Sequence, residues 1–289
     1  MAYISEATVD PALERATQAA ATAARESGVV IRELDNVAAL NDVIDLFSII
    51  WGRSGNPPMT IELLRAFTKA GNYVAGAFDG ETLVGACVGF FHAPSGSALH
   101  SHIAGVSAAA AGRKVGFALK LHQRSWALRR GVVEIAWTFD PLVSRNAYFN
   151  LTKLAARPVE YLPDFYGPMG DAINGGGASD RLLVSWRLRD ERVDRAVAGR
   201  PNEILADDEI ARGAVVALGV GPDGRPVAGR LDGETSLVAV PRDVEKLRGT
   251  DPAIAGVWRV AVRDALSGLT ERGGKIDGFT RDGQYVVRP

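Results

Sequence analysis

The 289-residue sequence has one cysteine, a net charge near zero and no apolar run long enough to cross a bilayer. A single cysteine, Cys87, excludes an internal disulfide and a multi-cysteine metal site. Its place in the apolar run 83–91 predicts a buried, unreactive thiol. The lack of an 18-residue apolar stretch, and an acidic N-terminus unlike a secretory signal, favour a cytoplasmic protein without membrane contact.

An excess of positive charge is also missing. Lys and Arg number 33 against 34 Asp and Glu, which gives a formal net charge of −1. Binding of nucleic acid generally uses a strongly basic surface, so we expect no nucleic-acid partner. The hydrophobic fraction of 47% is ordinary for a globular chain, and the length suits one large domain or two modest ones.

Apolar periodicity and turn residues predict the order of the secondary-structure elements. Helices are expected at 11–26, 38–51, 61–70, 113–130, 144–156 and 252–271. Strands are expected at 29–34, 73–78, 83–91, 99–106, 132–139, 182–188, 215–218, 227–231, 237–240, 276–279 and 285–287. Asp79-Gly80 predicts a tight hairpin. This order predicts an α/β fold with a mixed, largely antiparallel sheet flanked by helices.

A charged stretch at 187–200, followed by Pro201, marks the expected domain boundary. We expect an N-terminal helical extension at 1–28 and a main domain at 29–190. A small α/β subdomain at 191–289 is expected to pack on the main domain, because fewer than about 100 residues make a marginal core.

The most informative segment follows the strand expected at 99–106. Small residues lead into Gly112-Arg113-Lys114-Val115-Gly116-Phe117, where a helix is expected to begin. Successive amide N–H groups at a helix N-terminus, with the positive end of the helix dipole, favour a phosphate group. Small residues let the backbone approach such a ligand closely. The segment is therefore predicted to bind an anion such as a pyrophosphate.

These residues resemble the GNAT superfamily of acyl-coenzyme A-dependent N-acyltransferases. The family signature Gln/Arg-x-x-Gly-x-Gly/Ala is matched by Arg113 to Ala118, and a shifted register runs from Ala111 to Gly116. A later run, Trp137-Thr138-Phe139-Asp140-Pro141-Leu142, is similar to a bacterial subgroup described as predicted GNAT acetyltransferases.

The resemblance implies that acetyl-coenzyme A, or another acyl-coenzyme A such as the succinyl thioester, is the co-substrate, with no metal. The acyl group would pass to the amine of a small molecule such as an amino acid. Backbone groups of Ala104, Gly105 and Val106 would hold the pantetheine, with close packing as the alternative role of Gly105. Residues 112–117 would hold the pyrophosphate, with a solvated basic turn as the alternative. A homodimer is compatible with this interpretation.

Removal of a proton from the attacking amine needs a base. His100 and His102 alternate along one predicted strand, so we expect both side chains on the same side. A histidine suits proton removal near neutral pH, and the alternatives are a structural role or a metal pair that lacks a third ligand. Glu134 and Asp140 share one face of the next strand and are alternative bases, although Asp140 before Pro141 is also a turn former.

Many GNAT enzymes protonate the leaving thiolate with a tyrosine, and the resemblance places Leu151 at that position. Tyr166, Tyr148 and Tyr161 remain as candidate acids, with water as the alternative. Asn146 and Asn150 lie four residues apart on one helix face. They are expected to bond to the pantetheine or the loop backbone, with a capping or solvent role as the alternative.

Three arginines complete the set of candidates. Arg259 and Arg263, one helical turn apart, are expected to clamp a carboxylate of the donor or the acceptor, and the alternative is a solvated face. Arg124 is expected on the surface.

Two other functions stay open at this stage. One is a GNAT-like protein that binds coenzyme A or a partner without turnover. The other, weakly supported, is a serine hydrolase that would use Ser107 and the downstream His122.

Overall fold

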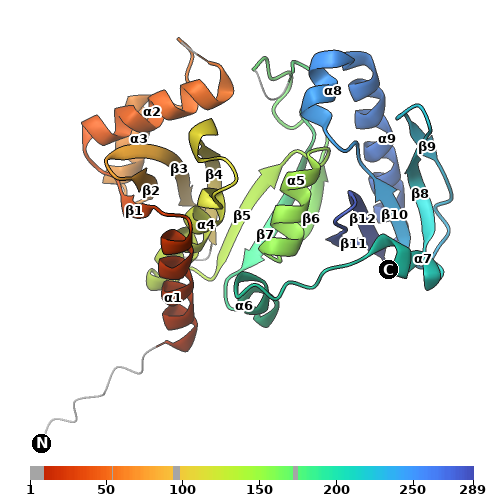
Figure 1. Cartoon of the computed structure of the whole chain (residues 1–289), viewed down its shortest axis with the longest axis horizontal. Coiled ribbons are helices and arrows are strands. Elements are labelled where there is room, and N and C mark those ends of the chain that lie inside the picture. The colour runs from red at the N-terminus through yellow and green to blue at the C-terminus, as the bar shows by residue number, and fades with distance from the viewer. Residues whose placement is uncertain (1–9, 54, 94–97, 172–174) are drawn as a thin grey trace, which may run out of the picture. The chain divides into compact units, whose positions relative to one another are not determined.

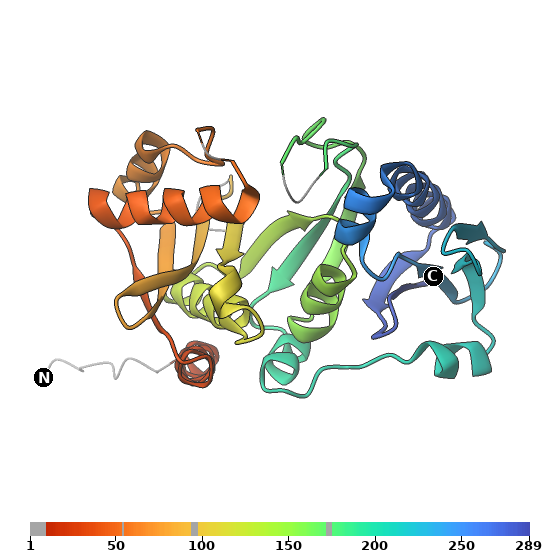
Figure 2. The ribbon, with the colours of Figure 1, turned by 45° about the horizontal axis from the view of Figure 1, so that its top comes forward.

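The computed structural model describes residues 10–53, 55–93, 98–171 and 175–289. The chain divides into two units, which we describe one at a time (Figures 1 and 2). Unit 1 comprises Met1–Ile135 with Leu188–Asp190, and unit 2 comprises Ala136–Arg187 with Glu191–Pro289. This division differs from the boundaries expected at 28/29 and 190/191, and residues 1–9 of the expected extension lie outside the described residues.

Polar caps and apolar periodicity explain where the elements of unit 1 begin. The side chains of Asp10, Asn36 and Thr60 each accept a hydrogen bond from an amide in the first turn of the helix that follows. The helices of unit 1 are α1 (Pro11–Glu26), α2 (Val37–Trp51), α3 (Ile61–Lys69), the 3-10 turn η1 (Ala108–Ala110) and α4 (Val115–Arg129). Its strands are β1 (Val30–Glu33), β2 (Tyr73–Asp79), β3 (Thr82–Phe91) and β4 (Ala98–Val106).

Strands β1 to β4 of unit 1 pair as consecutive antiparallel neighbours. The hairpin predicted between β2 and β3 is confirmed, with Gly80 at a φ of 57° in its turn. Helices α2 and α3 cover one face of these strands and α4 covers the other (Figures 1 and 2). Helix α1 packs on α4 through a row of buried alanines, and the hydroxyls of Thr17 and Ser125 lie 2.9 Å apart between the two helices.

Strand β5 (Glu134–Phe139) begins in unit 1 and continues into unit 2. The other strands of unit 2 are β6 (Arg157–Leu162), β7 (Arg181–Arg187), β8 (Val215–Val220), β9 (Pro226–Ala228), β10 (Ser236–Ala239), β11 (Lys275–Phe279) and β12 (Gln284–Arg288). Its helices are α5 (Ser144–Ala147), the π-helical segment η2 (Tyr148–Lys153), α6 (Glu191–Val197), α7 (Ala206–Ala211), α8 (Val244–Thr250) and α9 (Pro252–Glu271).

Among the described residues, β1 to β7 form a mixed sheet with the order β1-β2-β3-β4-β5-β7-β6 and flanking helices. The predicted fold class is therefore confirmed. A second sheet, entirely within unit 2, has the order β11-β12-β10-β8-β9. Helix α9 packs on this sheet with Trp258, Val262 and Leu266 buried, as the apolar periodicity of the helix indicates.

Several elements differ from the sequence predictions. Strand β6 and helices α6, α7 and α8 were not predicted, and each has at most seven residues, which is too short for a periodic signal. The strand expected at 227–231 ends at Ala228. The helix expected at 144–156 changes to π-helical winding at Tyr148 and ends at Lys153.

Candidate functional site

Strand β4 of unit 1 carries two histidines and a bulge. Its register with β3 shifts between Val88 and Gly89, which leaves His102 as the extra residue. The ring centroids of His100 and His102 lie 6.0 Å apart, and both rings contact Phe90, at 5.0 and 5.7 Å. The two imidazoles therefore lie together, as the sequence predicts, but a bulge rather than simple alternation brings them there.

Burial lowers the pKa of both imidazoles. Burial, with the neighbouring charges of His102, His92 and Lys120, lowers the pKa of His100 to about 4. Burial also lowers the pKa of His102. Both rings are therefore neutral at pH 7, so each has a ring nitrogen that can accept a proton. His102 is the more exposed of the two, which makes it the better candidate for a base.

A buried lysine lies beneath β4, and the sequence analysis did not single it out. Nζ of Lys120 donates to Oγ of Ser101 at 3.1 Å and to Oε1 of Gln123 at 3.0 Å. Nε2 of Gln123 donates to Sγ of Cys87 at 3.4 Å. Burial lowers the pKa of Lys120 to about 8. Burial raises the pKa of the Cys87 thiol, and the predicted buried cysteine is confirmed.

Beyond the bulge, Gly105 of β4 faces the end of α2. A Cβ at this position would lie 2.8 Å from Cδ1 of Ile50 and 3.0 Å from Cζ3 of Trp51. The packing of α2 is therefore sufficient to require glycine here. Of the two neighbours expected to hold pantetheine, Ala104 is exposed and Val106 is half-buried.

The loop after β4 ends in a left-handed turn. Gly112 has a φ of 78° and Lys114, the residue before α4, has a φ of 62°. Glycine adopts this conformation without strain, whereas a lysine does so at a cost. In the shifted register from Ala111 to Gly116, Lys114 stands at the first glycine position of the signature, and both registers stay predictions.

The first amides of α4 are open to a ligand. Within the described part of the chain, the N–H groups of Lys114, Val115 and Gly116 donate to no acceptor. A Cβ at Gly112 would have no neighbour within 4 Å, and one at Gly116 would meet only Cγ2 of Val106, at 3.8 Å. Small residues therefore leave space beside Gly112 and Gly116. The Lys114 side chain is exposed, while Val115 is buried and Phe117 is half-buried.

Arg113, predicted to contact pyrophosphate, binds groups of its own unit instead. Its Nη1 donates to Oδ2 of Asp79 at 2.6 Å, and its Nη2 donates to the carbonyls of Ser27 and Gly28, both at 3.1 Å. Because Ser27 and Gly28 follow α1, the guanidinium ties the end of α1 to the turn between β2 and β3. Lys114 is the neighbouring cation whose side chain extends into solvent.

Three further candidates of unit 1 have defined surroundings. Arg124, expected on the surface, is fully buried, and its Nε donates to the carbonyl of Leu188 at 3.0 Å. Nδ1 of His122 shares a 2.9 Å hydrogen bond with the hydroxyl of Tyr73. The serine hydrolase interpretation is therefore not supported, because His122 is bonded elsewhere than at Ser107. Glu134 is half-buried at the start of β5.

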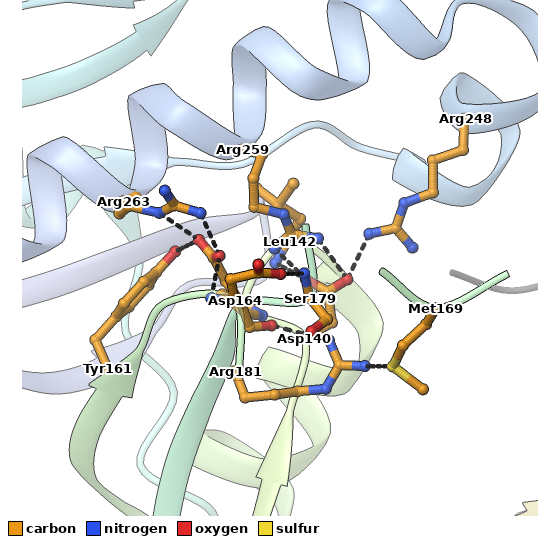
Figure 3. A network of polar contacts seen from close by, with 12 residues as sticks. Asp140, Leu142, Tyr161, Asp164, Met169, Ser179, Arg181, Arg248, Arg259 and Arg263 are labelled. Carbon is orange, nitrogen blue, oxygen red and sulfur yellow. Dashed lines mark hydrogen bonds and ion pairs between the residues drawn. The ribbon is translucent and has the colours of Figure 1, made fainter. Parts of the chain in front are cut away.

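In unit 2, arginines converge on two buried carboxylates (Figure 3). Asp140, directly after β5, accepts hydrogen bonds from Nη1 and Nη2 of Arg259 at 2.7 and 2.8 Å, and from Nη2 of Arg248. It also accepts from the amide of Leu142 at 2.9 Å, which confirms its predicted role in a turn. Burial acts to raise the pKa of Asp140, but Arg259 and then Arg248 lower it to about 2. A carboxylate held in this way is a poor base.

The second carboxylate, Asp180, is bound by Arg263 and Tyr161. Nε of Arg263 donates to its Oδ2 at 2.9 Å, and the hydroxyl of Tyr161 donates to the same oxygen at 2.6 Å (Figure 3). Arg259 and Arg263, predicted to clamp a carboxylate of a substrate, thus bind two carboxylates of their own chain. Burial and the neighbouring Asp180 raise the pKa of Tyr161, which makes it an unsuitable proton donor.

Tyr166 is the candidate acid with the most exposed hydroxyl environment. Its side chain is exposed, its hydroxyl lies 3.4 Å from Oγ1 of Thr138, and the guanidinium of Arg181 lies 5.3 Å from its ring centroid. By contrast, Tyr148 donates to Glu203 at 2.9 Å, and burial and Glu203 raise its pKa.

The helical segment after β5 places the two asparagines differently. Oδ1 of Asn150 accepts from Nε1 of Trp137 at 3.2 Å, and the side chain is buried. Asn146 is half-buried in α5. Leu151, at the position where the resemblance expects a tyrosine, is buried. The change to π-helical winding at Tyr148 alters the four-residue spacing on which the predicted common face depends.

Comparisons with known proteins give matches among solved structures. No protein-family model and no curated protein matches the chain. The solved structures that it resembles at low identity include the following three. Ard1 from Thermoplasma volcanium is 16% identical over 56% of this chain and 99% of its own, with a TM-score of 0.43. A GNAT family acetyltransferase from Elizabethkingia anophelis with acetyl-CoA bound is 13% identical over 55% of this chain and 98% of its own, with a TM-score of 0.43. The ribosomal-protein-S18-alanine N-acetyltransferase from Escherichia coli is 11% identical over 55% of this chain and 94% of its own, with a TM-score of 0.45.

No described helix combines the length and apolar character that a membrane span requires. Within the described residues, no group of three or more His, Cys, Asp or Glu residues is placed to hold a metal ion.

Proposed function

We propose that this protein transfers an acyl group from an acyl-coenzyme A to the amine of a small molecule. The observation that carries the proposal is the open set of amides at Lys114, Val115 and Gly116, at the start of a 15-residue helix that follows a bulged strand. Amides and a helix dipole at such a terminus favour a phosphate-bearing ligand. The exposed ammonium of Lys114 adds a positive charge beside them.

The proposed reaction is the attack of an amine on a thioester carbonyl. The amine nitrogen forms a bond to the carbonyl carbon, the carbon–sulfur bond breaks, and the thiolate leaves with the electron pair. The proton of the attacking amine passes to the imidazole of His102, which is neutral at pH 7 because burial lowers its pKa. His100 and Glu134 are the alternative bases. The thiolate takes a proton from water; Tyr166, a residue of unit 2, stays a prediction of the sequence for this role.

Binding without turnover is the second candidate function. The observation that favours it is the buried Leu151, because a leucine cannot supply the proton that the tyrosine of many GNAT enzymes gives to the thiolate. Measurement of coenzyme A binding and of free-thiol release distinguishes the two candidates. Binding together with amine-dependent thiol release supports the enzyme, and binding without release for any acyl donor and amine supports the binding protein.

The phosphate site itself is tested with one charge reversal and a matched control. Lys114→Glu should weaken coenzyme A binding, measured by calorimetry, by at least tenfold, because a negative charge replaces the positive one in front of the amides. Lys246→Glu reverses an equally exposed lysine of α8 and should leave the affinity unchanged. Equal affinities for Lys114→Glu and the unaltered protein would contradict the assignment of the loop.

A further inference from the structure

In unit 2, a groove of about 730 Å³ lies between α9 and the edge of the second sheet. Its walls come from α9 on one side and from β8, β9 and the segment after β9 on the other. The lining includes Leu218 and Pro226 of the sheet and Gly256, Val257, Val260 and Asp264 of α9. The volume lies in the range of small-molecule sites, about 300–1,000 Å³.

Small residues of α9 keep the groove open, and packing does not explain all of them. Gly256 lies inside a 20-residue helix, where glycine costs about 1 kcal/mol relative to alanine. A Cβ at Gly256 would have no neighbouring atom within 4 Å. No contact of the described residues therefore requires a glycine at this position, and its effect is to leave space in the groove.

Two exposed valines line this space. Val257 and Val260 of α9 are 45% and 52% exposed. Single exposed valines are common on protein surfaces, but two that line one groove are typical of a surface that binds an apolar group.

One charged side chain, Asp264, lines the groove. None of the described residues forms an ion pair with it. Its neighbour Arg263 is bonded to Asp180, and Arg272, two turns further along the chain, donates to the carbonyl of Leu231 at 3.2 Å. The lining thus offers an apolar surface with one carboxylate, which is complementary to an aliphatic group that carries one positive charge.

We propose that this groove binds a small organic cation with an aliphatic body, such as a primary alkylammonium ion. The alkyl chain lies along Val257, Val260 and the small residues, and the ammonium group lies at Asp264. The site lies entirely within unit 2. Its test is a binding measurement, so it does not depend on the acyl transfer proposed above.

The experiment uses the full-length protein and n-octylammonium chloride, with 1-octanol and octanoate as uncharged and anionic analogues. Calorimetry should show saturable binding of octylammonium, about threefold weaker binding of octanol and still weaker binding of octanoate. Methyl NMR of valine-labelled protein should show the largest shift changes at Val257 and Val260. The absence of saturable binding, or equal affinity for octylammonium and octanoate, would overturn the proposal.

Two variants separate the apolar and the charged contributions. Gly256→Leu fills the groove and should reduce octylammonium affinity at least tenfold, while the higher helix propensity of leucine preserves the fold. Gly249→Leu places the same side chain on α8, where a Cβ also has no neighbour within 4 Å, and should leave the affinity unchanged. Asp264→Asn should reduce octylammonium affinity about threefold, the size of a solvent-exposed ion pair, and leave octanol binding unchanged.

A second copy of this chain is the alternative occupant of an exposed apolar groove. Sedimentation velocity distinguishes it from a small cation. A dimer that dissociates in Gly256→Leu, with no effect of octylammonium on the unaltered protein, would overturn the proposal. A sedimentation coefficient that is unchanged by Gly256→Leu, with saturable octylammonium binding, supports it.

Discussion

The Asp140→Asn substitution tests the arginine–carboxylate network of unit 2. Asp140 and Arg259 have side chains only 8% and 9% exposed and share two hydrogen bonds of 2.7 and 2.8 Å. Asparagine keeps the shape of the side chain but removes its charge, so the guanidinium of Arg259 is left in a buried site without the carboxylate. Loss of one partner of a buried ion pair costs about 3–5 kcal/mol.

The pH dependence of stability gives an independent value for the free energy that ionised Asp140 contributes. The pKa of Asp140 is lowered from 3.8 to about 2, and each unit corresponds to about 1.4 kcal/mol, so the ionised carboxylate contributes about 2 kcal/mol. Because the folded-state pKa is the lower one, this contribution is fully present above pH 4. It is lost as the pH falls from about 4 through 2, and below 2 the carboxylate is protonated in both states.

Hydrogen exchange of the α9 amides measures this effect in unit 2 directly. At pH 7, Asp140→Asn should lower the opening free energy of α9 by about 3–5 kcal/mol. In urea unfolding followed by tryptophan fluorescence, the difference between the two proteins should shrink as the pH falls from 4 to 2. A loss below about 1 kcal/mol at pH 7, or a difference that does not change with pH, would refute the reasoning.

The double variant Asp140→Asn with Arg259→Met separates the unpaired charge from the lost contacts. Removal of both charges should leave the protein more stable than Asp140→Asn alone, because no guanidinium stays buried without its carboxylate. Additive losses would instead show that the two side chains do not interact.

Three further predictions concern unit 1. Lys114→Gly should raise the free energy of unfolding, measured in urea, by about 1 kcal/mol, because glycine adopts the left-handed φ of 62° without strain. A lower free energy of unfolding would show instead that the lysine side chain stabilises the loop. Arg113→Met should lower the free energy of unfolding by about 1–2 kcal/mol, because the hydrogen bonds to Asp79 and to the end of α1 are lost. The affinity for coenzyme A should change less than twofold. A loss of affinity larger than that of Lys114→Glu would contradict the assignment of Lys114, rather than Arg113, as the cation of the site. His102→Gln should reduce kcat/KM by at least 100-fold at pH 7, where the imidazole is neutral because burial lowers its pKa; a reduction of less than about threefold would exclude His102 as the base.

The sequence predicts those parts of the fold that local patterns determine. The helices α1 to α4 and α9 and the strands β2 to β4 lie within a few residues of their predicted ranges, because apolar spacing, caps and turn residues act over one or two turns of chain. The bulge at His102 is different. It depends on how β4 pairs with β3, and no single residue in the strand indicates it.

Buried polar side chains explain most of what the sequence does not reveal. Lys120, Gln123 and Arg124 lie on a helix that is buried on nearly every side, so the usual assumption that charged residues face solvent fails there. The spacing of Lys120 and Gln123, three residues apart on one helix, is the local signal of their shared bond.

Long-range pairing is the reason that the arginine predictions need revision. Arg113 and Asp79 are 34 residues apart, and Arg259 and Asp140 are 119 residues apart. A guanidinium that is suited to a substrate carboxylate or phosphate is equally suited to a carboxylate of its own chain, and the sequence alone cannot distinguish the two. Within unit 2, Arg259 of α9 binds Asp140 at the end of β5, a contact between residues on either side of position 190 that the sequence does not indicate.

The pairing of these arginines within the chain also bears on which groups would bind the proposed coenzyme A. Arg113 and Arg259 are held by carboxylates of this chain, whereas the amides of Val115 and Gly116 donate to no acceptor among the described residues. We therefore infer that phosphate recognition depends mainly on backbone groups, with Lys114 as the nearest cation. Backbone amides are fixed by the start of α4 and do not depend on the identity of the side chain. A loop of this kind can depart from the family signature at the first glycine, as this chain does at Lys114 in the shifted register, and still present the same donors.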